Sequence, residues 1–106
     1  DGDRRIVVIK SGDPRSAYCV IVDDLIMSGK TLFECAKALR SGGAQSVNVF
    51  VPHAVCPGSA LELISDEVFD DVWITDSCPW TVKKIPVSSK IKVVSLAPLI
   101  AQDLLR

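Results

Sequence analysis

Short apolar runs alternate with segments of helical period along this chain of 106 residues. The run at 17–22 is apolar without alternation, which is typical of a strand covered on both faces. A Gly- and Pro-containing turn at 11–14 would join this run to the one before it as a hairpin. Five runs in all have the β-branched and apolar content that favours strands, namely residues 6–9, 17–22, 47–51, 72–75 and 91–95.

The period changes to that of a helix in three places. From residue 31, apolar side chains recur at the spacing of one helical face, and the glycine pair at 42–43 provides the stop. A capping-box pattern at 59–62 predicts a short helix to about residue 64. A last helix is predicted to open at Pro98, with an apolar face that includes Leu96, Leu99, Ile100 and Leu104.

This alternation of strand and helix predicts the fold class. We expect one α/β domain over residues 1–106, with three layers and a mostly parallel sheet flanked by helices. Residues 76–90 are polar, contain two prolines and are expected to form a loop. In such folds ligands bind at the carboxyl ends of the strands.

Composition narrows the classes of partner. Twelve basic and thirteen acidic side chains give a formal net charge of −1, so we expect neither a nucleic acid nor a membrane as partner. No apolar run approaches about 18 residues, and no signal peptide is seen. The chain starts at Asp1 rather than Met, so we expect a piece of a longer protein.

The four cysteines carry information about the compartment. They are widely spaced without a CxxC pair, so we expect reduced thiols in a cytoplasmic protein rather than disulfides or a metal site.

The segment 20–31 carries the candidate chemistry. An apolar strand ends in Asp23 and Asp24, and the loop Ser28-Gly29-Lys30-Thr31 then opens a helix. Ionised carboxylates are acceptors that together can bind a vicinal diol. Hydroxyls and amides at a helix N-terminus favour a phosphate. A sugar phosphate has this polarity. The alternative is that the acids merely end a strand and Thr31 merely caps a helix.

A nucleoside-triphosphate P-loop does not explain this segment. The P-loop pattern GxxxxGK[ST] requires a glycine five residues before Gly29, and Asp24 occupies that position.

The segment resembles the phosphoribosyl-pyrophosphate (PRPP) signature of the type I phosphoribosyltransferase fold. The resemblance implies that Asp23 and Asp24 bind the ribose 2- and 3-hydroxyls and that residues 28–31 bind the 5-phosphate. Lys30 departs from the family pattern, which usually has glycine there. A Cβ at this position disfavours a positive φ, while the ammonium adds positive charge.

Three further stretches make the chain similar to the C-terminal part of the PRPP synthetases: residues 1–5, 51–58 and 73–79. The resemblance implies transfer of a diphosphoryl group from ATP to ribose 5-phosphate, which gives PRPP and AMP. It also implies Mg²⁺, a homo-oligomer and a longer two-domain parent. The catalytic residues and metal ligands of this family lie mostly upstream, so we expect the chain alone to be inactive.

Two rival functions use the same pocket. One is a phosphoribosyltransferase that consumes PRPP. The other is a non-catalytic regulator related to the synthetases. A product assay with ATP against one with a nucleobase would separate the two enzymes.

Other conspicuous residues have structural interpretations. His53 follows a strand at the expected ligand edge but has no orienting partner in the sequence, so we expect it to bond backbone. Trp73 and Trp80 are expected to pack in a core or interface. Residues 70–71 are expected to form a turn.

Overall fold

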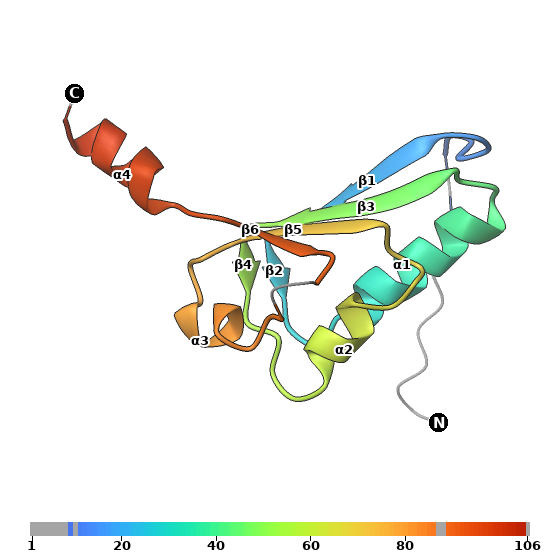
Figure 1. The fold of residues 1–106 in the computed structure, drawn as a ribbon. Coiled ribbons are helices and arrows are strands. Elements are labelled where there is room, and N and C mark those ends of the chain that lie inside the picture. The colour runs from blue at the N-terminus through green and yellow to red at the C-terminus, as the bar shows by residue number, and fades with distance from the viewer. Residues whose placement is uncertain (1–8, 10, 87–88, 106) are drawn as a thin grey trace.

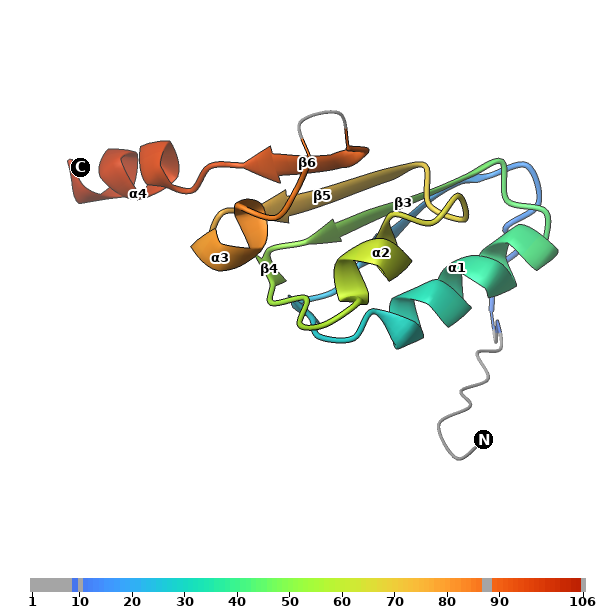
Figure 2. The same ribbon diagram turned by 60° about the horizontal axis from the view of Figure 1, so that its bottom comes forward.

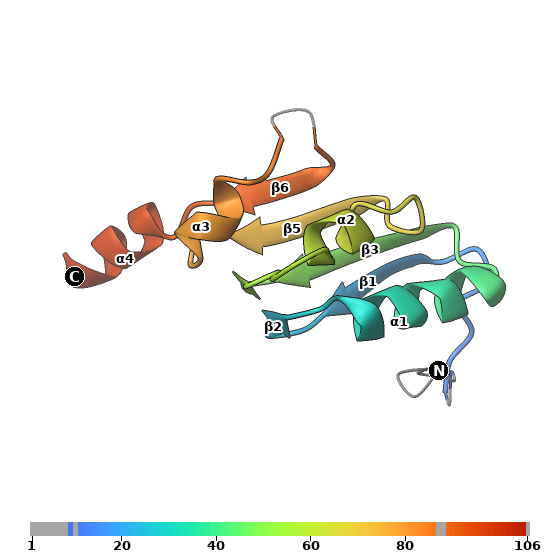
Figure 3. The same cartoon turned by 90° about the horizontal axis from the view of Figure 1, so that it is seen from below.

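A four-stranded parallel sheet forms the centre of the molecule. The computed structural model describes residue 9 and residues 11–86 and 89–105. The sheet has the strand order β1-β3-β5-β6, and its strands run in the same direction (Figure 3). The strands are β1 (Tyr18–Val22), β3 (Ser46–Val51), β5 (Asp71–Thr75) and β6 (Ile91–Val94). A two-stranded parallel sheet of β2 (Leu25–Ile26) and β4 (His53–Ala54) lies at its carboxyl edge.

The helices α1 (Lys30–Ser41) and α2 (Ala60–Ile64) lie against one face of this sheet (Figures 1 and 2). The short helix α3 (Pro79–Val82) follows β5, and α4 (Ala97–Leu104) projects beyond the carboxyl end of the sheet. None of these helices is long and apolar enough to cross a membrane.

The core lies between the sheet and the two helices. Alternate residues of β3 and β5 point toward the helices, because side chains of a strand alternate between its faces. They meet the apolar side of α1 and α2, and all are nearly inaccessible to solvent. The core includes Val47, Val49, Val51, Val72 and Ile74 from the strands, and Leu32, Ala36 and Ile64 from the helices.

Most of the predicted elements are confirmed. The α/β class and the parallel sheet are as expected, and three of the predicted strands differ from β3, β5 and β6 by at most one residue at an end. The first helix ends at Ser41, and Gly42 caps it as predicted. The predicted strand 6–9 and its hairpin fall mainly outside the described residues, and Ile9 is in no strand.

The prediction that both faces of residues 17–22 are covered is wrong. Tyr18, Val20 and Val22 are 72%, 61% and 71% exposed. The described helices beside the sheet lie on one face of it (Figure 1), and these three alternate side chains, being exposed, lie on the other face. The apolar run therefore correctly predicts a strand here, but it does not indicate whether one or both faces of that strand are packed.

Three smaller expectations also need correction. Ser59 precedes α2, but its side chain makes no capping hydrogen bond. The expected loop at 76–90 contains α3, and Asp71 belongs to β5 rather than to a turn. The last helix is present as α4, and none of its residues is buried. Trp73 and Trp80 are exposed, which excludes the core alternative for both and leaves interface packing as a prediction. Trp73 packs under the Lys92 ammonium.

Candidate functional site

The loop between β1 and α1 changes direction at one glycine. Gly29 is the N-cap of α1, is buried and has a φ of 81°. A Cβ built on it would lie 3.2 Å from Cγ2 of Ile64 in α2. Glycine is required here because a side chain would meet both left-handed backbone strain and the neighbouring helix.

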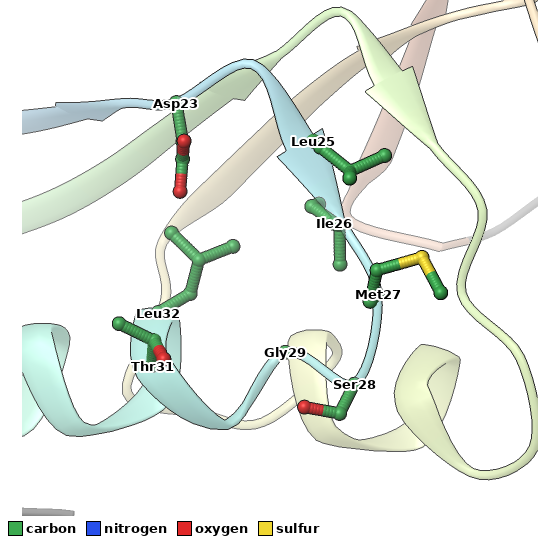
Figure 4. A pocket seen from close by; sticks show the side chains of 8 residues that line it. All are labelled: Asp23, Leu25, Ile26, Met27, Ser28, Gly29, Thr31 and Leu32. Carbon is green, nitrogen blue, oxygen red and sulfur yellow. The ribbon is translucent and has the colours of Figure 1, made fainter.

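A cavity of about 200 Å³ opens between β2 and the start of α1 (Figure 4). Four of the six predicted site residues line it, and Asp24 and Lys30 do not. Its apolar wall comes from side chains that the sequence analysis did not single out. The lining consists of Asp23, Leu25, Ile26, Met27, Ser28, Gly29, Thr31 and Leu32.

Polar groups occupy two sides of this cavity. The Asp23 carboxylate extends from the end of β1, and the Ser28 and Thr31 side chains lie across from it at the helix start (Figure 4). Oδ1 of Asp23 accepts a hydrogen bond of 2.8 Å from the amide of Asp24. Asp23 and Asp24 are both exposed, so the fold does not bury the acids against itself.

Lys30 fits the loop without left-handed backbone. The positive φ of the loop falls on Gly29, and Lys30 begins the helix proper. The amide of Lys30 donates to the hydroxyl of Ser28 over 3.3 Å. A lysine at the position of the family's glycine therefore leaves the course of the loop intact.

His53 lies beside the cavity wall. It starts β4 and pairs in register with Leu25 of β2, which lines the cavity. The expected backbone bond is wrong, because Nδ1 of His53 lies 2.8 Å from the hydroxyl of Ser77. The sequence could not reveal this partner, since 24 residues separate the two side chains.

Burial and hydrogen bonds shift the pKa of three groups. Burial raises the pKa of the Cys56 thiol to about 11, with a contribution from Cys78, and burial also raises the pKa of Cys35. The amide of Leu96 and the hydroxyl of Ser95 lower the pKa of Asp76. All four cysteines are free, with Cys56 and Cys78 buried and Cys19 and Cys35 partly buried. Cys56 and Cys35 are therefore held as thiols and are poor nucleophiles.

The donor set for a metal ion is incomplete. The described residues include no group of three or more His, Cys, Asp or Glu side chains placed to hold an ion. The Mg²⁺ that the family resemblance implies does not fit a site made by these side chains alone.

Comparisons with known proteins assign the chain to a family. Residues 5–106 match the family model described as "Phosphoribosyl synthetase-associated domain". Ribose-phosphate pyrophosphokinase 4 from Arabidopsis thaliana is 46% identical over 98% of this chain and 33% of that protein. Its namesake from Oryza sativa is 47% identical over 98% of this chain and 34% of the relative.

A solved structure has the same fold. Phosphoribosylpyrophosphate synthetase from Mycobacterium smegmatis superposes with a TM-score of 0.79 at 29% identity, over 90% of this chain and 31% of that one. The chain thus spans about a third of the length of the proteins it matches.

Proposed function

Because the chain belongs to the phosphoribosyl synthetase-associated domain family, we propose that it supplies the ribose 5-phosphate pocket of a ribose-phosphate diphosphokinase. Residues 1–106 form the C-terminal, phosphoribosyltransferase-like domain of a longer two-domain parent. The observation that carries the proposal is the cavity at the carboxyl edge of the sheet, with a carboxylate on one side and hydroxyls at a helix start on the other.

The pocket holds the sugar by its two polar ends. Asp23 and Asp24 accept hydrogen bonds from the 2- and 3-hydroxyls, and Ser28, Gly29, Lys30 and Thr31 donate to the 5-phosphate. Asp24 and Lys30 do not line the cavity itself, so their contacts are to the parts of the ligand at its rim. The ammonium of Lys30 adds charge that favours the phosphate dianion.

Fixing both ends of the sugar orients its 1-hydroxyl. That oxygen attacks the β-phosphorus of ATP, the bond to the α-phosphate oxygen breaks, and PRPP and AMP result. The chain contributes by positioning the sugar, which lowers the activation barrier because the 1-hydroxyl is already oriented when the substrates meet. ATP and Mg²⁺, which neutralises phosphate charge, are held by other parts of a homo-oligomeric parent. The free thiols fit a reducing compartment, the cytoplasm.

Titration of the full-length parent with ribose 5-phosphate tests the pocket. Asp24→Asn should weaken binding about tenfold to a hundredfold, because a hydrogen bond from a hydroxyl to a charged acceptor is lost. Glu67→Gln is the matched control, since it neutralises an exposed acid in the turn before β5. Unaltered affinity in Asp24→Asn contradicts the role of that carboxylate.

Product assays separate the possible activities. We expect the parent to form AMP from ATP and ribose 5-phosphate, and the isolated 106-residue chain to form none. Turnover of PRPP with a nucleobase instead would identify a phosphoribosyltransferase. Binding of ribose 5-phosphate without any turnover by the parent would identify a non-catalytic relative of the synthetases.

A further inference from the structure

A second polar cluster lies next to the proposed pocket, and none of its residues has a role in the proposed function. Its centre is the ring of His53 at the start of β4. Nδ1 lies 2.8 Å from the Ser77 hydroxyl, and that hydroxyl lies 3.2 Å from the carbonyl oxygen of Pro52. The Thr75 hydroxyl also donates to this carbonyl. The cluster joins β4 to the end of β5.

The proton positions in this cluster follow from its acceptors. A carbonyl oxygen can only accept, so the Ser77 hydroxyl donates its single proton to Pro52. The same hydroxyl oxygen must then accept a hydrogen bond from His53, which places the ring proton on Nδ1. In the neutral ring, Nε2 therefore carries a lone pair and is an acceptor.

The Cys78 side chain packs against the face of the His53 ring. Its sulfur is buried and lies 3.4 Å from both Nδ1 and Nε2 of His53. A sulfur in the ring plane at equal distance from both nitrogens would clash with the carbon between them, so it packs over the face. The Nε2 lone pair, which lies in the ring plane, is not used by this contact. The histidine as a whole is exposed.

The sheet register places His53 next to a residue of the pocket wall, although His53 itself does not line the cavity. His53 is the in-register neighbour of Leu25, and in-register residues of parallel strands project to the same side. Leu25 lines the cavity, with Asp23 two residues before it and Ser28 three residues after it. An exposed histidine whose ring is oriented by Ser77 and Cys78 therefore stands beside the apolar part of the cavity wall.

We propose that His53 is a further ligand-binding residue of this pocket, whose Nε2 accepts a hydrogen bond from a sugar hydroxyl, and that Ser77 is the positioning residue that fixes its tautomer. This inference rests on the proposed function, because it takes the pocket's ligand to be a pentose phosphate. It adds a contact on the sugar side and none on the phosphate side. The group that His53 would bind is a hydroxyl that donates a hydrogen bond. Inorganic phosphate bound at the loop would not offer such a hydroxyl to His53.

Two isosteric variants of the full-length parent separate the ring nitrogens. His53→Asn keeps an N–H near Nδ1 and loses the group at Nε2, while His53→Gln keeps a polar atom near Nε2. In calorimetric titrations, His53→Asn should weaken ribose 5-phosphate binding about tenfold and His53→Gln by no more than about threefold, as expected for one hydrogen bond. The affinity for inorganic phosphate should stay within about twofold of wild type in both variants.

Ser77→Ala tests the positioning role independently. Removing the hydroxyl should move the ¹⁵N shifts of the His53 ring toward a mixture of tautomers and weaken ribose 5-phosphate binding about threefold. An unchanged tautomer in this variant overturns the role of Ser77.

Three further results would overturn the assignment of His53. If His53→Asn binds ribose 5-phosphate with wild-type affinity, His53 makes no hydrogen bond to the sugar. If the His53 variants lose affinity for phosphate and for ribose 5-phosphate equally, the ring has a purely structural role. The same holds if His53→Asn keeps the affinity for ribose 5-phosphate better than His53→Gln does. If the wild-type parent binds ribose 5-phosphate and His53→Asn binds it with the same affinity, only this inference fails. If the wild type does not bind it, the proposed function fails as well.

Discussion

Individual residues at the start of α1 shape both the turn into the helix and the wall of the cavity. Gly29 turns the chain in a left-handed conformation while it lies against α2, and this turn sets the loop beside the cavity. Lys30, one residue later, has helical backbone and tolerates a side chain. The two positions of the loop are therefore not equivalent, and the family's second glycine can be replaced while the first cannot.

Gly29→Ala should destabilise the 106-residue chain by about 2 kcal/mol, from left-handed strain and the contact with Ile64. Gly12→Ala is the control, because Gly12 has a similar φ of 85° but open space around its Cβ. We expect Gly12→Ala to cost about 1 kcal/mol, from backbone strain alone. Urea unfolding measures both, and equal losses would show that the contact with α2 contributes nothing.

The buried Cys56 thiol should make the free energy of unfolding depend on pH in the alkaline range. The unfolded chain releases the thiol proton near the ordinary pKa of 9.0, whereas the folded chain holds it to about 11. Between these values the unfolded state binds fewer protons, so the free energy of unfolding falls as pH rises. We expect Cys56 to account for a loss of about 1–2 kcal/mol across this range.

Urea unfolding of wild type and Cys56→Ala at pH 8 and pH 10.5 checks this expectation. The variant starts less stable because a buried side chain is shortened, but its stability should fall less with pH. The same pH dependence in both proteins would show that Cys56 does not titrate differently in the two states.

Among the elements, α4 has the weakest attachment to the rest of the chain. It has no buried residue and projects past the sheet (Figure 1). One anchor at its start is the Asp76 carboxylate, whose Oδ1 accepts a 2.9 Å hydrogen bond from the Leu96 amide at the N-cap of the helix. The junction between β6 and α4 is thus tied to the end of β5.

Asp76→Ala should therefore speed amide hydrogen exchange in residues 96–105 while leaving that of β3 and β5 unchanged. In wild type the protection factors of the same amides, which correct for the slower intrinsic exchange at low pH, should fall on acidification. The lowered pKa of Asp76 means that its contribution is complete above the ordinary pKa of an aspartate and is lost as pH falls through the folded value. Exchange in α4 that is insensitive to both changes would exclude this anchor.

At the scale of the whole molecule, the two faces of the sheet differ. One face is packed by α1 and α2, and the other carries exposed apolar side chains on three neighbouring strands: Tyr18, Val20, Val22, Phe50 and Trp73. Beside them the Lys92 ammonium lies 5.0 Å from the centre of the Trp73 ring and 2.6 Å from Asp71. An apolar surface of this kind promotes association in water.

The 106-residue chain should therefore bind a hydrophobic dye and associate as its concentration rises. Replacing Val20 and Val22 together by threonine should reduce both effects at a cost of less than about 1 kcal/mol, because threonine suits exposed strands. Val49→Thr is the control, since the same change in the buried core costs about 1–3 kcal/mol. Dye fluorescence and light scattering check the outcome, and undiminished association in the double variant would locate the contact elsewhere.

The local pattern by itself determined the strand and helix order, the parallel class and the segment 23–31, because periodicity, glycine stops and motif spacing act over a few residues. Only the tertiary structure decided which sheet face is packed, that β2 and β4 pair, and that Ser77 meets His53 across 24 residues. A two-residue strand has no period to detect, and burial depends on which distant elements reach a surface. The cavity is likewise a property of packing, since its apolar wall and its polar residues come together only when α1 folds back beside β2.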